Sequence, residues 1–236
     1  MSIISVPDLT TIEWQPLADH TFTLLDGIDV VRVNIDTASS FFSEMLLPDE
    51  VQKMERFRNL QSRNQFLTSR GAVRYLSAKY TGREPLEFSW NEGPNKKPHW
   101  QNPGNELYFN IAHSGSYVVI CFGRTEMGID IERIQNEFAY EEILNRCFDI
   151  DEINAIRDAP EPLAVFYLLW TRKESLLKAV GMGILDDLTK VSCINDVYTT
   201  EAGDEWLLNS FVMEDNYLLS LACKAGTGLI RYWDFG

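Results

Sequence analysis

Residues 127–134 read MGIDIERI, and apolar and acidic side chains alternate through the centre of this stretch. In a β-strand the alternation sends the two central isoleucines to one face and Asp130 and Glu132 to the other. Two like charges at this spacing repel each other unless water or a cation lies between them. The pattern is typical of a half-buried strand with a wet polar face. It also offers the oxygen ligands that a hard cation such as Mg²⁺ prefers.

Downstream of this strand, residues 163–180 are predicted to form a helix that ends at a glycine. Within it, the stretch WTRKESLLK (residues 170–178) places Glu174 and Lys178 one helical turn apart. Glutamate before lysine at this spacing is the favourable order for an ordinary surface ion pair. The alternative is a functional pair, in which the glutamate is a third carboxylate for a metal and the lysine an ammonium group for a phosphate.

Upstream, residues 107–111 and 117–122 are predicted strands joined by a tight turn that contains His113. A histidine in such a turn is commonly a solvated bystander rather than a catalytic group. The preceding residues 91–106 are rich in proline and glycine, which predicts a loop. Two adjacent lysines in that loop, taken by themselves, indicate no more than a loop with a positive charge.

A predicted helix over residues 61–80 ends at Gly82, which suits a left-handed cap. Its apolar side chains share one side, and three arginines share another: Arg63, Arg70 and Arg74. From Lys53 to Lys97 there are ten lysines and arginines against four acidic residues, although the whole chain has a net charge of −14. A basic stripe is ordinary on a solvated helix, and it is also the form that an anion-binding wall would take.

The remaining predicted elements mix helices and strands, and the sequence has no internal repeat. Further helices are predicted over residues 37–47, 48–57, 141–148 and 151–156. Further strands are predicted over residues 191–194, 206–213, 217–223 and 229–233. This mixture, with several neighbouring strands able to pair in antiparallel fashion, predicts an α+β fold.

Composition narrows the class of protein. A hydrophobic content of 45% is typical of a globular chain, and the net charge of −14 argues against binding nucleic acid through a general positive field. The first 16 residues do not read as a signal peptide, and the apolar runs are too short to span a membrane. The four cysteines are widely spaced among apolar neighbours, which predicts buried free thiols and fits a cytoplasmic location.

Three motifs occur together and resemble those of the 4′-phosphopantetheinyl transferases, in the order of that family: FNIAHS (109–114), GIDIE (128–132) and WTRKESLLK (170–178). Lys97-Pro98 also matches the end of the family's Gly-Lys-Pro loop, and the helix up to Arg74 resembles its basic N-terminal helix. The length resembles the monomeric surfactin-synthetase-activating type rather than the half-size trimeric type. Two departures, Lys96 in place of the loop glycine and Ala112 in place of a common serine, concern contacts to the coenzyme.

The resemblance implies a fold of two similar α+β halves, residues 1–126 and 127–236, with the active site in the cleft between them. It implies an enzyme that transfers the 4′-phosphopantetheine arm of coenzyme A to a serine of an apo acyl- or peptidyl-carrier protein. Adenosine 3′,5′-bisphosphate would be released. The enzyme would be a cytoplasmic monomer serving fatty-acid, polyketide or nonribosomal-peptide synthesis.

The resemblance also implies roles for individual residues. The ligands of Mg²⁺, or of Mn²⁺ as an alternative, would be Asp130, Glu132 and Glu174. The catalytic groups would be Glu174 as the base for the carrier serine, Lys178 on a pyrophosphate oxygen, and His113. The coenzyme, and chiefly its 3′-phosphoadenosine end, would meet Arg63, Arg70, Arg74, Lys96, Lys97, Pro98, His113 and Ser114, with Lys178 at the pyrophosphate.

Two other functions stay open on the same residues. One is a magnesium-dependent phosphohydrolase or nucleotidyl enzyme that uses the three carboxylates with water as the nucleophile. The other is a module that binds a carrier protein or a nucleotide without catalysis. Incubation with coenzyme A and an apo carrier protein distinguishes the three, because only transfer adds mass to the carrier.

Overall fold

The computed structural model describes residues 9–23, 27–92, 98–100, 107–181, 188–213 and 216–236. The chain divides into two compact units. The N-terminal unit comprises Glu13–Thr125 and Gly228–Gly236, and the C-terminal unit comprises Met1–Ile12 and Glu126–Thr227. The chain crosses between them at residue 126, but each unit also takes a terminal segment from the other end of the chain. In this respect the units differ from the two contiguous halves expected from the sequence.

The N-terminal unit is built on a mixed sheet with the strand order β1-β11-β2-β6-β5. Its strands are β1 (Gln15–Pro16), β2 (Gly27–Asn34), β5 (Tyr108–Ser114), β6 (Tyr117–Gly123) and β11 (Leu229–Asp234). β2, β6 and β5 pair in antiparallel fashion, whereas β11 runs parallel to both of its neighbours. The C-terminal strand therefore completes the sheet of the N-terminal unit.

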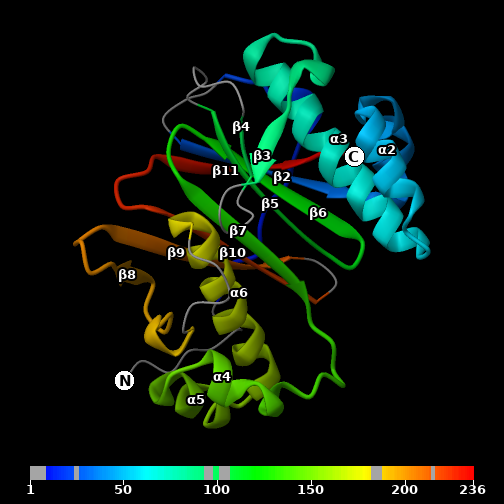
Figure 1. The fold of residues 1–236 in the computed structure, drawn as a ribbon. Helices are drawn as coiled ribbons and strands as arrows, with labels where there is room; N and C mark the ends of the chain where they lie inside the picture. Colours follow the sequence, from blue (N-terminus) through cyan, green and yellow to red (C-terminus); the bar gives the residue numbers. More distant parts are fainter. Residues whose placement is uncertain (1–8, 24–26, 93–97, 101–106, 182–187, 214–215) are drawn as a thin grey trace. The chain divides into compact units, whose positions relative to one another are not determined.

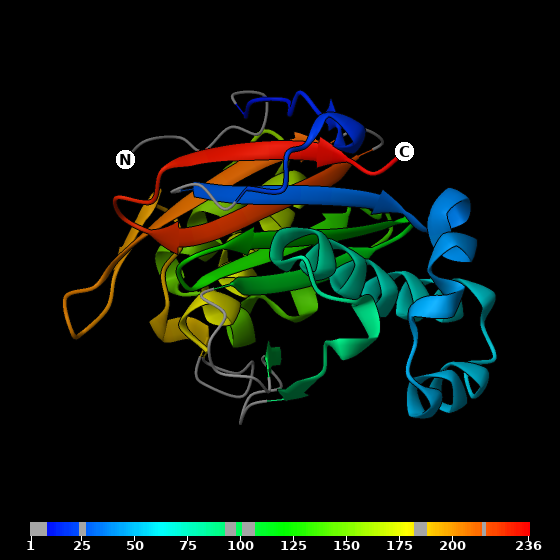
Figure 2. The ribbon, with the colours of Figure 1, turned by 90° about the horizontal axis from the view of Figure 1, so that it is seen from above.

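The long helix α3 (Leu60–Thr81) runs along one face of this sheet (Figure 2). It begins where the Asn59 side chain accepts hydrogen bonds from the backbone nitrogens of the first turn, and it ends at Gly82 with φ of 70°. The shorter elements of this unit are η2 (Leu17–Asp19), α1 (Ile35–Ala38), η3 (Ser39–Met45), α2 (Pro48–Glu55), η4 (Pro85–Glu87), β3 (Trp90–Glu92) and β4 (Pro98–Trp100).

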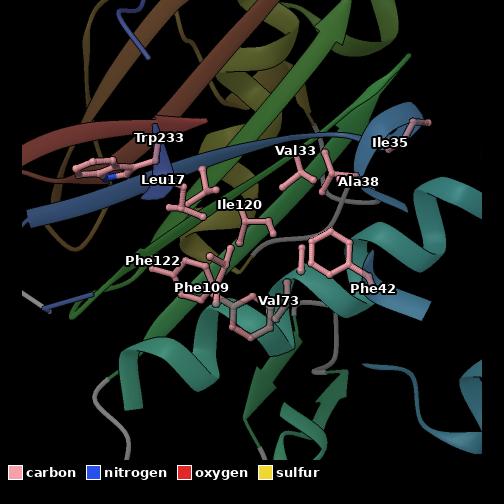
Figure 3. Packing of buried hydrophobic residues seen from close by; sticks show 14 of the residues in the cluster. Leu17, Val33, Ile35, Ala38, Phe42, Val73, Phe109, Ile120, Phe122 and Trp233 are labelled. Atoms are coloured by element: carbon pink, nitrogen blue, oxygen red, sulfur yellow. The ribbon is translucent and has the colours of Figure 1, made fainter. Parts of the chain in front are cut away.

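The core of the N-terminal unit forms between α3, η3 and the sheet. Figure 3 shows Val73 of α3 and Phe42 of η3 directed toward Phe109 and Phe122 of the strands. All four side chains are at most 5% exposed, so the hydrophobic effect holds the helix to the sheet. A side-chain carbon at Gly71 would overlap Phe42, because α3 and η3 approach too closely for any larger residue.

A buried carboxylate ties β11 to the rest of this unit. Asp29 of β2 accepts hydrogen bonds from Arg231 at 2.7 and 3.0 Å, from the Trp233 indole at 3.0 Å and from the Tyr80 hydroxyl at 2.7 Å. Its carboxylate also lies 3.1 Å from the His20 ring. Burial raises the pKa of Asp29, but the interactions with His20, Tyr80 and Trp233 outweigh it and hold the pKa below its usual range.

The C-terminal unit has an antiparallel sheet in the order β7-β10-β9-β8. Its strands are β7 (Met127–Arg133), β8 (Val197–Thr199), β9 (Glu205–Met213) and β10 (Tyr217–Lys224). Its helices are η5 (Tyr140–Glu142), α4 (Leu144–Cys147), α5 (Ile150–Arg157), α6 (Pro162–Val180) and η6 (Leu188–Lys190). Figure 1 shows α6 lying against the sheet of this unit, and its strongest packing is with β7 and β10.

The α+β class expected from the sequence is confirmed, and so are most of the strands and the helices predicted over residues 48–57, 61–80, 151–156 and 163–180. Three local predictions were wrong. Residues 37–47 form a short α-helix followed by a 3₁₀ helix, residues 141–148 are likewise divided, and residues 191–194 form no strand. The sequence analysis also missed β1, β2 and β8, and it assigned to one loop the stretch in which β3 ends and β4 lies.

The four cysteines are all free and buried, as the sequence predicted. Among the residues that the structure describes, none of the helices combines the length and the apolar character needed to cross a membrane.

Candidate active site

The acidic strand β7 and the helix α6 approach each other so closely that only glycine fits between them. A side-chain carbon at Gly128 would overlap the Ser175 carbonyl oxygen and the Ala179 backbone nitrogen. Since side chains alternate along a strand, Asp130 and Glu132 share the face of β7 that this glycine turns toward α6. The glycine of the GIDIE motif therefore brings the two carboxylates to the helix.

Lys178 of α6 pairs with the strand rather than with its own helix. Its Nζ donates a hydrogen bond of 2.6 Å to Asp130 Oδ1 and one of 3.2 Å to the Ile129 carbonyl. Asp130 is only 6% exposed, so this face of the strand is not the wet face that alternation alone suggests. The ordinary surface pair between Glu174 and Lys178 is likewise not what the structure contains, because the lysine ammonium is directed to Asp130.

Glu174 is a buried carboxyl group in a negative environment. It is 7% exposed, and its Oε1 atom is buried and has no hydrogen-bond partner among the described residues. Burial, followed by the negative charge of Asp130, raises its pKa from 4.5 to about 7. The Lys178 ammonium lowers this pKa and Glu132 raises it further. The three carboxylates that the sequence suggested as metal ligands thus influence one another electrostatically.

The donor chemistry of these residues fits a hard divalent cation. The candidate ligands offer carboxylate oxygens, one of them orphaned and buried, and a cation would remove the repulsion that raises the Glu174 pKa. In the described part of the chain, however, no three His, Cys, Asp or Glu side chains are gathered closely enough to form a metal site. One Asp130 oxygen is instead paired with Lys178.

Two cations that precede Glu174 in the motif fix the position of α6. Arg172 donates to the Cys193 and Ile194 carbonyls at 3.2 and 3.1 Å, and to Asp196 at 2.6 Å. Its Nε also donates to a serine of β9. The sequence analysis assigned neither cation a role, although two adjacent cations that follow a long apolar stretch of the helix were a signal that they are buried and paired.

The second of these cations, Lys173, is completely buried. Its Nζ lies 2.7 Å from Glu152 Oε2 and donates to the Leu188 carbonyl at 2.9 Å and to the Val191 carbonyl. The other oxygen of Glu152 accepts from the Cys193 backbone nitrogen at 2.9 Å. These contacts join α5, α6 and the segment around η6, so they hold the helix that carries Glu174 against its surroundings.

The three arginines of α3 do not share one environment. Arg63 is exposed, Arg70 is half-buried, and Arg74 is 1% exposed. The Arg74 guanidinium donates to the Phe88 carbonyl at 2.9 Å, to the Met45 carbonyl at 3.2 Å and to Glu50 at 2.6 Å. These bonds give Arg74 a structural role inside the N-terminal unit.

Arg70 and Arg74 line a pocket of about 300 Å³ within the N-terminal unit, which we call the arginine pocket. Its other lining residues include Glu50, Lys53, Phe66 and Trp90. The Arg70 guanidinium lies 4.7 Å from the Trp90 ring centre and 5.5 Å from that of Phe66, and its Nε lies 3.8 Å from Glu50. Cations beside aromatic faces suit a planar, anionic ligand. The sequence analysis did not single out Lys53, Phe66 or Trp90.

The histidine motif occupies the hairpin between β5 and β6. His113 is exposed near the end of β5, and Ser114 is half-buried and pairs with Tyr117 across the turn. Lys96 and Lys97 lie outside the described residues, and the backbone of Pro98 begins β4. The structure therefore describes the histidine side of the expected coenzyme site but not its lysine loop.

Comparison with known families identifies the class to which this fold and site belong. Residues 126–222 match the family model of the 4′-phosphopantetheinyl transferase superfamily. Residues 35–124 match the model described as the N-terminal part of a 4′-phosphopantetheinyl transferase. The two matches adjoin and follow the order of the two units along the chain. The chain belongs to the 4′-phosphopantetheinyl transferase superfamily, whose members transfer 4′-phosphopantetheine from coenzyme A to carrier proteins.

Individual relatives agree with this assignment. A putative 4′-phosphopantetheinyl transferase of Synechocystis is 29% identical over 197 residues, which are 77% of this chain and 80% of the relative. The 4′-phosphopantetheinyl transferase HetI of Nostoc is 25% identical over 232 residues, 94% of this chain and 98% of the relative. The 4′-phosphopantetheinyl transferase Sfp of Bacillus subtilis is 28% identical over 160 residues, 67% of this chain and 70% of the relative.

Proposed function

We propose that the acidic face of β7 and α6 is the catalytic centre of this transferase and that it works with Mg²⁺, for which Mn²⁺ is an alternative. The observation that carries the proposal is the buried carboxyl of Glu174, which has an orphaned oxygen and a pKa near 7 beside Asp130. Glu174, Asp130 and Glu132 would hold the cation. When bound, it supplies positive charge that neutralises the pyrophosphate of coenzyme A.

The side chains of the chain itself would then perform two tasks. Lys178, already extended from α6 to β7, would exchange its pairing with Asp130 for a pyrophosphate oxygen. Glu174 would accept the proton of the carrier serine, directly or through a water, with the buried oxygen that has no hydrogen-bond partner among the described residues. The serine oxygen forms a bond to the β-phosphorus, and the bond from that phosphorus to the bridging oxygen breaks, so that adenosine 3′,5′-bisphosphate leaves.

The arginine pocket is our candidate for the 3′-phosphoadenosine end of the coenzyme. Arg70 and Lys53 would face the 3′-phosphate, while Trp90 and Phe66 offer aromatic faces to the base. His113 and Ser114, with Arg63, Lys96, Lys97 and Pro98, stay in the proposal as further contacts. Arg74 is the exception, because its donors already bind Glu50 and two carbonyls, and we assign it to positioning.

The proposal also includes a cytoplasmic, monomeric enzyme of the surfactin-synthetase-activating type. Four buried free thiols support a reducing compartment, and relatives of this type and length support the subtype. The carrier protein belongs to fatty-acid, polyketide or nonribosomal-peptide synthesis.

The test is incubation with coenzyme A, Mg²⁺ and a panel of apo carrier proteins, followed by mass spectrometry of the carriers. Transfer adds the phosphopantetheine arm to the carrier. Release of free phosphate without a mass gain would support a hydrolase, and binding without turnover would support a binding module.

A second measurement addresses the metal. Calorimetric titration of the wild-type protein with Mg²⁺ should give binding that Asp130→Ala abolishes, and Asp130→Ala should also abolish transfer. Full transfer activity in excess chelator would reject the metal, and unchanged Mg²⁺ binding by Asp130→Ala would reject this ligand.

A further inference from the structure

Two glutamines of α3 hold the hairpin turn that carries the histidine motif. The side-chain nitrogens of Gln61 and Gln65 donate hydrogen bonds of 2.9 and 3.0 Å to the same carbonyl oxygen, that of Gly115. Residues four apart on a helix lie one above the other, so the two amides reach the turn from one face of the first helical turns. A carbonyl oxygen has two lone pairs, and here both are used.

The turn itself is short and is fixed from a second side. Ser114 pairs with Tyr117, which leaves only Gly115 and Ser116 as the residues of the turn. Gly115 has φ of 53°, a value that favours glycine and suits the first central position of a two-residue hairpin turn. The Ser116 carbonyl accepts a hydrogen bond of 2.9 Å from the backbone nitrogen of Ile35. Both carbonyls of the turn are thus held by other elements.

The same helix connects the turn with the arginine pocket. α3 holds Gly115 through its first two turns and contributes Arg70 to the pocket a little over one turn after Gln65. A helix is a rigid spacer with a rise of about 1.5 Å per residue. The glutamines therefore set the distance between the histidine turn and the cation that we place at the 3′-phosphate.

We propose that Gln61 and Gln65 are positioning residues for His113, which act by holding the Gly115 carbonyl. His113 lies two residues before Gly115 on an exposed hairpin, and the two amides restrain that hairpin together with the strand pairing and the Ile35 hydrogen bond. Binding of a coenzyme phosphate by His113 depends on its position, because a misplacement of about 1 Å is enough to lose most of a directed contact. This inference rests on the proposed role of His113 in coenzyme binding.

The test is the double variant Gln61→Ala/Gln65→Ala, assayed for transfer with coenzyme A. Loss of two hydrogen bonds at a partly exposed site should raise KM for coenzyme A roughly threefold to tenfold, with kcat nearly unchanged. In a His113→Ala background the same double change should cause no further rise in KM for coenzyme A, because the glutamines act through the histidine. Gln52→Ala, an exposed glutamine on α2, is the matched control and should leave KM unchanged.

A second readout does not depend on activity. The chain has three histidines, so the His113 ring signal can be identified in NMR spectra by its loss in His113→Asn. The double variant should shift or broaden that signal and leave the signal of the buried His20 unchanged. An unmoved His113 signal, or an equal rise in KM in the His113→Ala background, would overturn the inference. If His113→Ala itself does not alter KM, the proposed role of His113 fails, and the NMR signal still decides whether the glutamines hold the turn.

Discussion

Replacing Glu174 with glutamine should stabilise the metal-free protein at alkaline pH. Burial and the negative charge of Asp130 raise the pKa of this carboxyl from 4.5 to about 7. The folded protein thus keeps a proton that the unfolded chain releases near pH 4.5, and above pH 7 the folded state carries the cost of a buried carboxylate. At about 1.36 kcal/mol per pKa unit, this cost is about 3 kcal/mol.

Urea unfolding in the presence of a chelator measures this effect. At pH 8 the free energy of unfolding of Glu174→Gln should exceed that of the wild type by about 3 kcal/mol. At pH 5 the difference should fall below about 1 kcal/mol, because the wild-type carboxyl is then protonated in the folded state. Glu161→Gln, an exposed residue just before the same helix, is the control and should show no such pH dependence. Equal stability at pH 8, or a difference that does not vary with pH, would refute the reasoning.

Mg²⁺ should reverse part of the difference. A cation bound by the wild-type carboxylates stabilises the folded wild type more than the variant, so the difference at pH 8 should narrow as Mg²⁺ is added. If Glu174 is chiefly the base, the same substitution should lower kcat for transfer by roughly 10²–10⁴ with little change in coenzyme affinity. If it is chiefly a ligand, Mg²⁺ and coenzyme binding should weaken together.

Three further predictions concern other parts of the structure. Gly128→Ala should force β7 away from α6, lower the free energy of unfolding in urea by about 1–3 kcal/mol and abolish transfer. A variant as stable as the wild type would contradict the close approach of β7 to α6. Arg70→Ala should raise KM for coenzyme A at least about tenfold but hardly alter KM for dephospho-coenzyme A, and a preserved preference for coenzyme A would remove this arginine from the phosphate site. Asp29→Asn should lower the free energy of unfolding by about 3 kcal/mol or more, because it leaves Arg231 without its counter-charge. A thermal unfolding midpoint within a degree of the wild type would show that the Asp29 carboxylate is dispensable.

The acidic motif and its helix could be predicted from the sequence because their signals are local. Alternation identified β7, and an apolar helical pattern ending at a glycine identified α6. What the sequence could not give is the depth at which these residues lie. Whether Asp130 faces water or Lys178 depends on how closely strand and helix approach, and that distance is set by packing at Gly128.

For the arginines of α3, too, the sequence could predict the side of the helix but not the burial. A helical pattern places Arg63, Arg70 and Arg74 on one side, but the partners that bury Arg74 come from Glu50 and from two distant carbonyls. Likewise, β2 is almost wholly buried although Asp29 and Arg32 interrupt its apolar residues, and its pairing with β11 leaves no local trace in either segment. Contacts between distant segments decide these features.

The place of β11 has a consequence for how the protein is made. This strand lies between β1 and β2, and its Arg231 meets Asp29 across a separation of 202 residues. A ribosome completes β2 long before β11, so one edge of β2 stays unpaired while Glu126–Thr227 of the C-terminal unit is still being synthesised. An open apolar strand edge is a template for incorrect pairing. We therefore expect the nascent chain, more than the finished enzyme, to need protection by chaperones.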